Sequence, residues 1–296
     1  MRRLVIASCF LAAIFVFLDT PVRAQDISPS EQLRNLKTDR TVISDEAAAK
    51  QPESAFKFEF SLAFDQLFPA NKNGSWEQAS LVFYHTPAMW IEYFIEADYG
   101  NFNGESVGTF SAGATMELGK HASTYLSVAT GTVGKSSNAF SGELWFGFPF
   151  GAGPVTITPE AGLIYTKYWG INTDITTYPG LMLEWREWWA EYYLYVTVSE
   201  PGDVTALSNR VAFGYTKPAR FWSYITAKFG NQGYMSKNSK TKGYVLDTNR
   251  FWDIWYTHRH WIRSWWGLFG YIDYCHQEGK NNFDKVGFQI GAFWSF

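Results

Sequence analysis

The chain has 296 residues, 46% of them hydrophobic and 19% aromatic, and its formal net charge is −3. Mean hydropathy is slightly negative at −0.19, so the apolar residues are interleaved with polar ones, which disfavours a helical membrane protein. The charge balance shows no basic excess of the kind that indicates nucleic-acid binding.

Residues 1–24 have the pattern of a secretory signal peptide. Arg2 and Arg3 precede an apolar run from Leu4 to Leu18, and the segment ends in Ala24. The run is shorter than the ~20 residues that a membrane-spanning helix needs. Cleavage near Ala24 would leave Cys275 as the one cysteine, which excludes an intramolecular disulfide and CxxC metal or redox motifs. We therefore expect export, and we predict neither a metal site nor a cofactor.

Residues 25–54 contain no Phe, Tyr or Trp and ten charged residues. Such a segment cannot bury enough apolar surface to order itself alone. The composition predicts a flexible periplasmic leader. A plug that enters the following domain is the alternative.

From residue 55 to 296 the pattern has a period of two. Phe56, Phe58 and Phe60 alternate with Lys57 and Glu59, and successive residues of a strand point to opposite faces. Continuing this pattern predicts fourteen strands, with twelve as the alternative, near residues 56–65, 78–84, 91–98, 109–118, 123–132, 140–148, 155–168, 176–186, 189–199, 207–217, 221–230, 250–259, 264–275 and 284–296.

The links between these strands alternate in length. Short links are expected at residues such as 86–89, 119–122 and 260–263, and longer polar loops at residues such as 68–75 and 231–249. Tight turns at one rim and longer loops at the other are typical of an antiparallel up-and-down barrel in an outer membrane. The sequence therefore predicts an all-β, closed transmembrane β-barrel.

Tryptophan positions support a membrane location for this barrel. Residues that directly follow the short turns include Trp90, Trp189, Trp222 and Trp265, and residues near the longer loops include Trp76, Trp169 and Trp252. Two girdles of interfacial rings around an apolar band fit a bilayer. A soluble β-sandwich is the alternative, but its shared core needs fewer tryptophans.

The final segment, "DKVGFQIGAFWSF" at 284–296, predicts a last strand with Val286, Phe288 and Ile290 facing lipid and Phe296 at its end. Here the chain resembles bacterial outer-membrane β-barrel proteins, whose last strand alternates in this way and ends in a phenylalanine that the assembly machinery reads. The resemblance implies location in a Gram-negative outer membrane. It also implies lipid, lipopolysaccharide and the barrel-assembly machinery as partners. A weaker resemblance is to small exopolysaccharide-linked barrels of the YaiO kind.

The inward-facing positions of such a barrel carry more acids than bases. The set comprises eleven acids and six bases: Glu59, Glu92, Glu96, Asp98, Glu117, Glu143, Glu160, Glu184, Glu191, Asp253 and Asp273, with Lys57, Arg186, Arg210, Lys228, Arg259 and Lys285. So many charges are too costly for a dry core, so the lumen must be wet or closely networked. We expect Glu96, Glu143, Glu160 and Arg210 to line it.

Fourteen strands leave room for a modest pore, and rings of charge set ion preference. The favoured function is therefore a water-filled channel for small hydrophilic solutes with mild cation preference. Alternatives are a closed structural or adhesive barrel, an export partner for polysaccharide and a lipid-modifying enzyme.

One further cluster is visible near the predicted turn at 260–263. His258 and His260 flank Arg259 and could bind phosphate or a metal ion, but the favoured interpretation is a solvated periplasmic turn whose aromatics anchor at the interface. No GxSxG, HExxH or useful Ser/His spacing stands out. The sequence therefore predicts no catalytic residue.

Overall fold

The computed structural model describes nine stretches of the chain: residues 56–68, 74–102, 106–133, 138–168, 173–200, 204–217, 220–237, 244–279 and 282–296. The predicted signal peptide, the predicted leader and Trp169 lie outside the described residues. In the described parts, no helix is long and apolar enough to cross a membrane.

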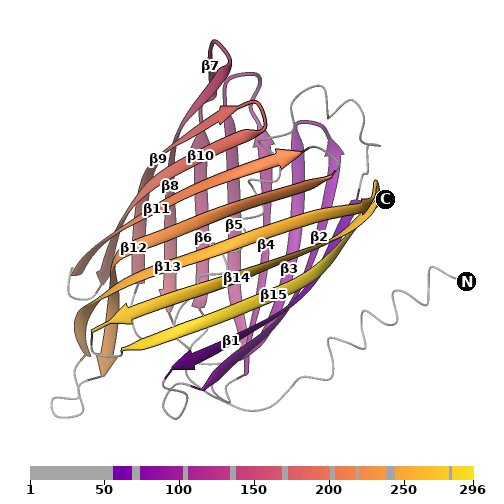
Figure 1. Cartoon of the computed structure of the whole chain (residues 1–296). Coiled ribbons are helices and arrows are strands. Elements are labelled where there is room, and N and C mark those ends of the chain that lie inside the picture. The colour runs from indigo at the N-terminus through magenta and orange to yellow at the C-terminus, as the bar shows by residue number, and fades with distance from the viewer. Residues whose placement is uncertain are drawn as a thin grey trace, which may run out of the picture.

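The described residues form one antiparallel sheet (Figure 1). Its strands are β1 Phe56–Phe68, β2 Ser75–Ala88, β3 Ile91–Phe102, β4 Ser106–Glu117, β5 Ser123–Val133, β6 Asn138–Gly147, β7 Phe150–Ala152, β8 Val155–Tyr168, β9 Thr173–Trp185, β10 Trp188–Glu200, β11 Val204–Lys217, β12 Phe221–Lys237, β13 Tyr244–Arg263, β14 Trp266–Glu278 and β15 Phe283–Ser295.

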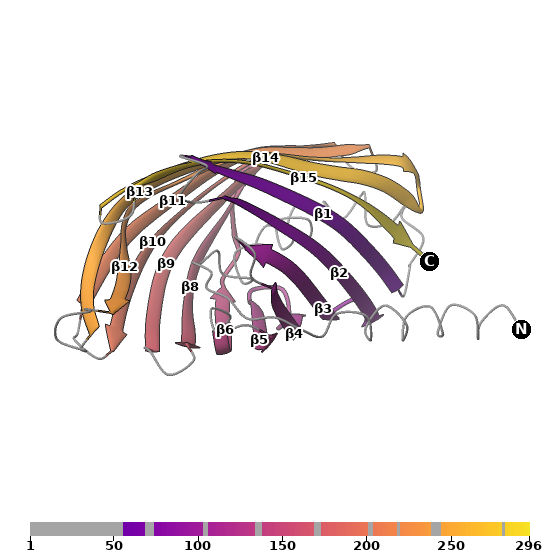
Figure 2. The same cartoon turned by 90° about the horizontal axis from the view of Figure 1, so that it is seen from below.

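Apart from β6, which pairs with β8, each strand pairs with the next along the chain, and the first pairs with the last. The short β7 continues the path of β6 along β8, so fourteen strands make up the wall. Figure 1 shows the β7–β8 hairpin projecting beyond one rim, and Figure 2 shows the same sheet turned to be seen from below. The prediction of a closed, fourteen-strand up-and-down barrel is confirmed.

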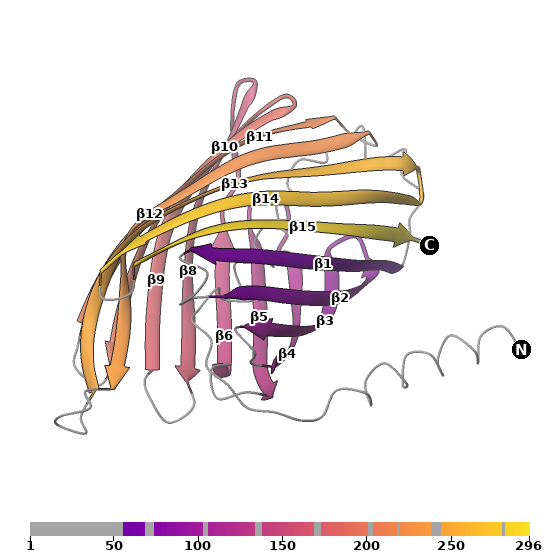
Figure 3. The same cartoon turned by 60° about the horizontal axis from the view of Figure 1, so that its bottom comes forward.

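The seam between β1 and β15 closes the barrel completely. Figure 3 shows the two strands side by side, and their register runs from Lys57 opposite Ser295 to Phe68 opposite Asp284. At the end of the seam, the Phe296 amide donates to the Phe56 carbonyl at 2.9 Å, and the Phe56 amide donates to the Phe296 carbonyl at 3.1 Å. Closure gives hydrogen-bond partners to the backbone amide and carbonyl groups of the two edge strands, which lipid could not supply.

The two faces of the wall differ as the period-two pattern predicts. On β15, Val286, Phe288 and Ile290 are exposed on the outside, whereas Lys285 and Phe293 are buried on the inside. The same outward exposure of large apolar side chains recurs around the sheet. An outer surface of this kind is stable against hydrocarbon and costly in water.

Two predicted links are wrong. Residues 231–249 were expected to form a long loop, but β12 extends to Lys237 and β13 begins at Tyr244, so most of this segment is a paired hairpin; residues 238–243 lie outside the described parts. Residues 260–263 belong to β13, and the turn follows them. Polar composition predicts a loop at 231–249, yet a strand that projects beyond a membrane can be polar on both faces.

The predicted tryptophan girdles are only partly correct. Trp90, Trp252 and Trp265 are exposed, but Trp189 and Trp222 are inward-facing and only 1% and 3% exposed, and Trp76 is buried as well. Closeness to a turn shows only how far a tryptophan lies along its strand. Whether its position is odd or even in the strand decides if the ring faces lipid or the interior.

Several inward aromatic rings lie directly on a glycine of the neighbouring strand. The register pairs are Phe94 with Gly113, Tyr178 with Gly162, Tyr193 with Gly180, Trp189 with Gly214, Phe269 with Gly291 and Phe293 with Gly267. In each pair, a Cβ added to the glycine would overlap the ring. The glycines therefore let large rings lie along the inner wall, a known way of supporting glycine in sheets.

Candidate functional site: the interior of the barrel

The four predicted lining residues all face inward and are buried. Glu96 on β3 and Glu143 on β6 are 2% exposed, Glu160 on β8 is 6% exposed, and Arg210 on β11 is 4% exposed. Two other members of the predicted inward set, Glu117 and Arg186, are exposed where β4 and β9 end. The low exposure of the four shows that the interior around them is closely packed.

Glu96 and its neighbour Asp98 are held by neutral donors. Ser80 and Ser111 donate to the two oxygens of Glu96, at 3.2 Å and 3.0 Å. Thr109 donates to Asp98 at 3.0 Å, and Gln78 donates to its other oxygen at 3.3 Å. These donors come from β2 and β4, the strands on either side of β3, so the sheet register itself builds this pair of carboxylate sites.

Glu143 and Glu160 are held by aromatic side chains. The Tyr178 hydroxyl donates to Glu143 at 2.6 Å. The Trp145 indole donates to Glu160 at 3.1 Å, and the Tyr193 hydroxyl donates to the same oxygen. Tyr178 and Tyr193 are two of the rings that lie on glycines, so the glycine opposite each ring places its hydroxyl next to a carboxylate.

The inner wall formed by β2 to β9 is acidic. Its inward positions carry Glu92, Asp174 and five further carboxylates, Glu96, Asp98, Glu143, Glu160 and Glu184, and we call these five the acidic sector. In the described residues of β2 to β9 and the turns between them, the Lys and Arg residues are Lys120 and Lys167, and both are exposed. No described cationic side chain of these strands therefore faces the acidic sector.

The rest of the wall, from β10 through β15 to β1, carries the buried bases in ion pairs, and we call it the paired sector. Arg210 contacts Glu191 at 2.7 Å. Lys285 contacts Asp273 at 2.7 Å and Asp65 at 3.6 Å. Partners on adjacent or nearby strands neutralise much of the charge on this side.

Arg259 forms an ion pair that spans four neighbouring strands of the paired sector, from β13 across β14 and β15 to β1. Its guanidinium on β13 donates to Glu59 on β1 at 2.6 Å, and Lys57 approaches the same Glu59 oxygen at 3.2 Å. The guanidinium also lies 3.8 Å from the centre of the Phe293 ring. The period-two pattern predicts Arg259 and Glu59 inside but not Phe293, because an inward aromatic breaks the expected apolar-out pattern.

A cavity of ≈ 70 Å³ lies where the two sectors meet. Glu59 and Arg259 contribute to its lining from the paired sector, and Glu96 contributes from the acidic sector. The hydroxyl groups of Ser61, Ser80 and Thr257 also line it, together with apolar and aromatic side chains that include Val82, Trp222 and Phe269. A space of this size accommodates a few water molecules.

The predicted cluster around Arg259 is divided by the wall. Arg259 points inward, whereas His258 and His260 lie on the outer face, where their rings stack at a centroid distance of 6.0 Å. Ser223 Oγ lies 2.7 Å from His258 Nδ1, a pairing that sequence spacing did not reveal. In the described part of the chain no carboxylate or amide contacts the other nitrogen of His258, so the pair lacks the third group of a catalytic triad.

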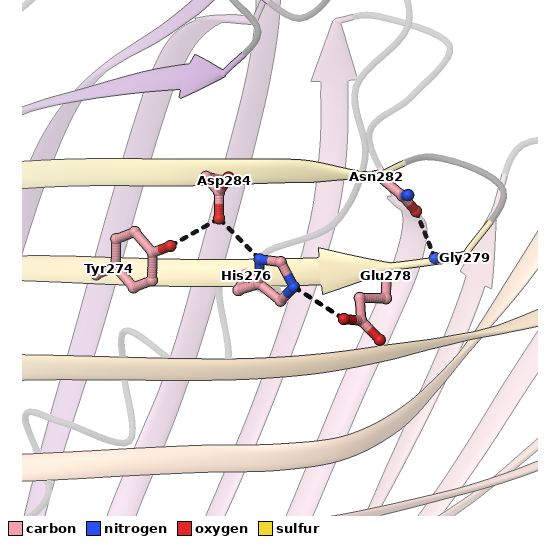
Figure 4. Close-up of polar contacts among 6 residues, drawn as sticks. All are labelled: Tyr274, His276, Glu278, Gly279, Asn282 and Asp284. Carbon is pink, nitrogen blue, oxygen red and sulfur yellow. Dashed lines mark hydrogen bonds and ion pairs between the residues drawn. The ribbon is translucent and has the colours of Figure 1, made fainter.

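A second polar group lies on the outer face at the opposite end of the strands (Figure 4). Tyr274 donates to Asp284 at 2.7 Å, and the same Asp284 oxygen lies 2.7 Å from His276 Nδ1. His276 Nε2 lies 3.3 Å from Glu278. Among the residues that the structure describes, no group of His, Cys, Asp and Glu has an arrangement suited to a metal ion, and Cys275 is a free, half-buried thiol.

The glycine at position 162 provides a direct test of this inner wall. Gly162→Ala would place a methyl group inside the Tyr178 ring and displace the hydroxyl that binds Glu143. We expect a loss of about 1–3 kcal/mol in the free energy of unfolding, measured by urea titration in lipid vesicles. Gly151→Ala is the control, because no atom lies within 4 Å of its added Cβ; equal effects of the two changes would contradict the packing described.

Neither family models nor curated proteins match this chain. Among solved structures it is similar to the outer-membrane protein Omp33 of Acinetobacter baumannii, with 10% identity, a TM-score of 0.49 and coverage of 83% of this chain and 100% of that one. It is also similar to a bacterial polysaccharide outer-membrane secretin, with 9% identity, a TM-score of 0.44 and coverage of 83% of this chain and 99% of that one. A third similar structure is an anion-selective porin of Comamonas acidovorans, with 8% identity, a TM-score of 0.42 and coverage of 81% of this chain and 98% of that one.

These similarities extend to general architecture and no further, because the TM-scores are below 0.5. The chain's own strand order, seam closure and apolar outer face define its class. The fold is that of the outer-membrane β-barrel proteins.

Proposed function

We propose that this chain is an outer-membrane channel that conducts small cations through the interior of its barrel. The observation that supports this most is the acidic sector, in which carboxylates are held by hydroxyl, indole and amide donors. These donors hold the carboxylates in place along the inner wall, and rings of carboxylates favour cations along a pore. Export by residues 1–24 and location in a Gram-negative outer membrane complete the proposal.

The dimensions of the interior favour ions over larger hydrophilic solutes. The lining acids are buried, and the cavity between the sectors measures ≈ 70 Å³. A fourteen-strand barrel has backbone room for a wider pore, so packing and not strand number would limit the flow. We therefore propose a low conductance carried by small inorganic cations.

Selectivity of the channel should depend on the acidic sector. Replacing Glu143 and Glu160 together by Gln keeps an oxygen acceptor for Tyr178 and Trp145 but removes two negative charges. We expect the zero-current potential under a KCl gradient to move from the cation side towards zero. Asp284→Asn is the control, because this acid lies on the outer face; an unchanged potential in the double variant would contradict a path along these residues.

Deleting residues 25–54 distinguishes two ways of narrowing the channel. A rise in conductance would identify the leader as a plug. Unchanged conductance would assign the narrowing to side chains of the barrel wall.

A closed structural barrel is the second candidate, and the near-complete burial of the inward charges favours it. In a closed barrel, buried ion pairs and hydrogen bonds of this kind would stiffen the barrel wall. The two functions differ in one observable, since a closed barrel passes no ionic current in a planar bilayer.

The final residue is proposed to serve in assembly through the barrel-assembly machinery. Deleting Phe296 removes two backbone hydrogen bonds of the seam, worth about 1 kcal/mol each, and we expect a modest loss of stability in vitro. In cells we expect a much larger fall in assembled barrel, measured by heat-modifiable gel mobility of outer-membrane fractions. Phe296→Ala retains the backbone bonds, so normal assembly of this variant would argue against recognition of the ring.

A further inference from the structure

Basic side chains gather on two neighbouring short turns of the barrel. Lys217 and Arg220 flank the β11–β12 turn, and Arg263 ends β13; all three are exposed. His260 lies on the outer face between them, directly opposite Phe221. The Trp261 amide donates to the Arg220 carbonyl at 2.9 Å, which joins the two turns. We call Lys217, Arg220, His260 and Arg263 the basic turn cluster.

The cluster is unusual among the short turns of the described chain because the strand ends that carry it contain no acid; the nearest acid in sequence contact is Glu187 of the neighbouring β9–β10 turn, whose carbonyl accepts from the Thr216 amide at 2.8 Å beside Lys217. At the β4–β5 turn Lys120 is accompanied by Glu117, and at the β9–β10 turn Arg186 is followed by Glu187. By contrast, residues 211–222 and 256–268 contain no Asp or Glu. Arg259, the remaining base in these segments, points inward to Glu59.

The surroundings of the cluster are apolar and aromatic. Ile262, Trp265 and Leu268 are exposed beside it, and the Trp265 and Trp266 rings lie 6.2 Å apart. Exposed tryptophans next to an apolar band are typical of the level where lipid headgroups meet hydrocarbon. The basic side chains are therefore at the height of phosphates and not in bulk water.

We propose that the basic turn cluster binds the phosphate of an anionic phospholipid in the periplasmic leaflet. Short turns lie on the periplasmic side in barrels of this class. Arginine binds phosphate in a bidentate manner, and a local surplus of bases selects lipids with net negative charge over zwitterionic ones. The inference requires a membrane-spanning barrel and is independent of conduction, so its failure would leave the channel proposal unaffected.

Native mass spectrometry of the full mature chain, with phosphatidylglycerol and phosphatidylethanolamine present in equal amounts, tests this site. We expect phosphatidylglycerol to be retained roughly tenfold more, and the variant Arg220→Gln/Arg263→Gln to lose most of this preference. The matched control Lys120→Gln/Lys167→Gln removes two exposed bases that lie on other strands, away from the cluster, and it should keep the preference. Equal retention of the two lipids by the unaltered protein, or equal loss in both variants, would overturn the proposal.

Two additional measurements keep the test decisive. Raising the salt concentration should reduce phosphatidylglycerol retention by the unaltered protein, which needs no variant to fold. Inorganic phosphate at millimolar concentration should not displace the lipid, because the apolar surroundings contribute to lipid binding; displacement would show a free-phosphate site and overturn the assignment to a lipid.

Discussion

Replacing Arg259 by methionine is expected to lower the free energy of unfolding of the barrel by about 3–5 kcal/mol. Glu59 would remain buried after the change and would lose the guanidinium that contacts it at 2.6 Å. Lys57 remains at 3.2 Å but is more exposed and compensates only partly. Urea titration of the folded protein in lipid vesicles measures the loss.

A double-mutant cycle separates the charge effect from lost packing. Arg259→Met combined with Glu59→Gln removes both charges, and we expect most of the stability to return, because replacing a buried ion pair by neutral groups is often close to neutral. A residual loss would measure the contact between the guanidinium and the Phe293 ring. A double variant as unstable as the single Arg259 variant would contradict the description of this contact as a buried ion pair.

A charge on the outer wall should be the other strongly destabilising change. Ile290 lies near the middle of β15 and is 59% exposed on the outer face. Ile290→Arg is expected to cost about 2–4 kcal/mol, the value for arginine at the bilayer midplane of a β-barrel. Urea-dependent refolding into vesicles measures this cost.

Val286→Arg is the matched control on the same strand and the same face. Val286 lies four residues closer to the loop end, where the cost falls to about 0–1 kcal/mol. Equal stability of Ile290→Arg and the unaltered protein would show that the outer face is not in hydrocarbon.

Alternation made the fold predictable from sequence. The segment that begins Phe56-Lys57-Phe58 already separates two faces, and fourteen such segments require closure once one face meets lipid. Loop composition was a poorer guide. Most of the polar segment 231–249 is a paired hairpin, because a polar residue is excluded from a strand only where its side chain faces hydrocarbon.

The candidate site was predictable in location but not in its contacts. Parity placed Glu96, Glu143, Glu160 and Arg210 inside, yet their partners come from strands whose pairing only the closed register defines. Arg259 and Glu59 are 200 residues apart in sequence and meet because β1 pairs with β15. Inward aromatics such as Trp189 and Phe293 were assigned to lipid or overlooked, because hydrophobicity alone does not show which face a ring occupies.

The most direct test of a cation-conducting barrel is the zero-current potential of the unaltered protein in a planar bilayer under a KCl gradient. The acidic sector predicts discrete current steps of low conductance and a potential on the cation-selective side. Anion selectivity, or a bilayer that contains folded protein and shows no current steps, would contradict this account.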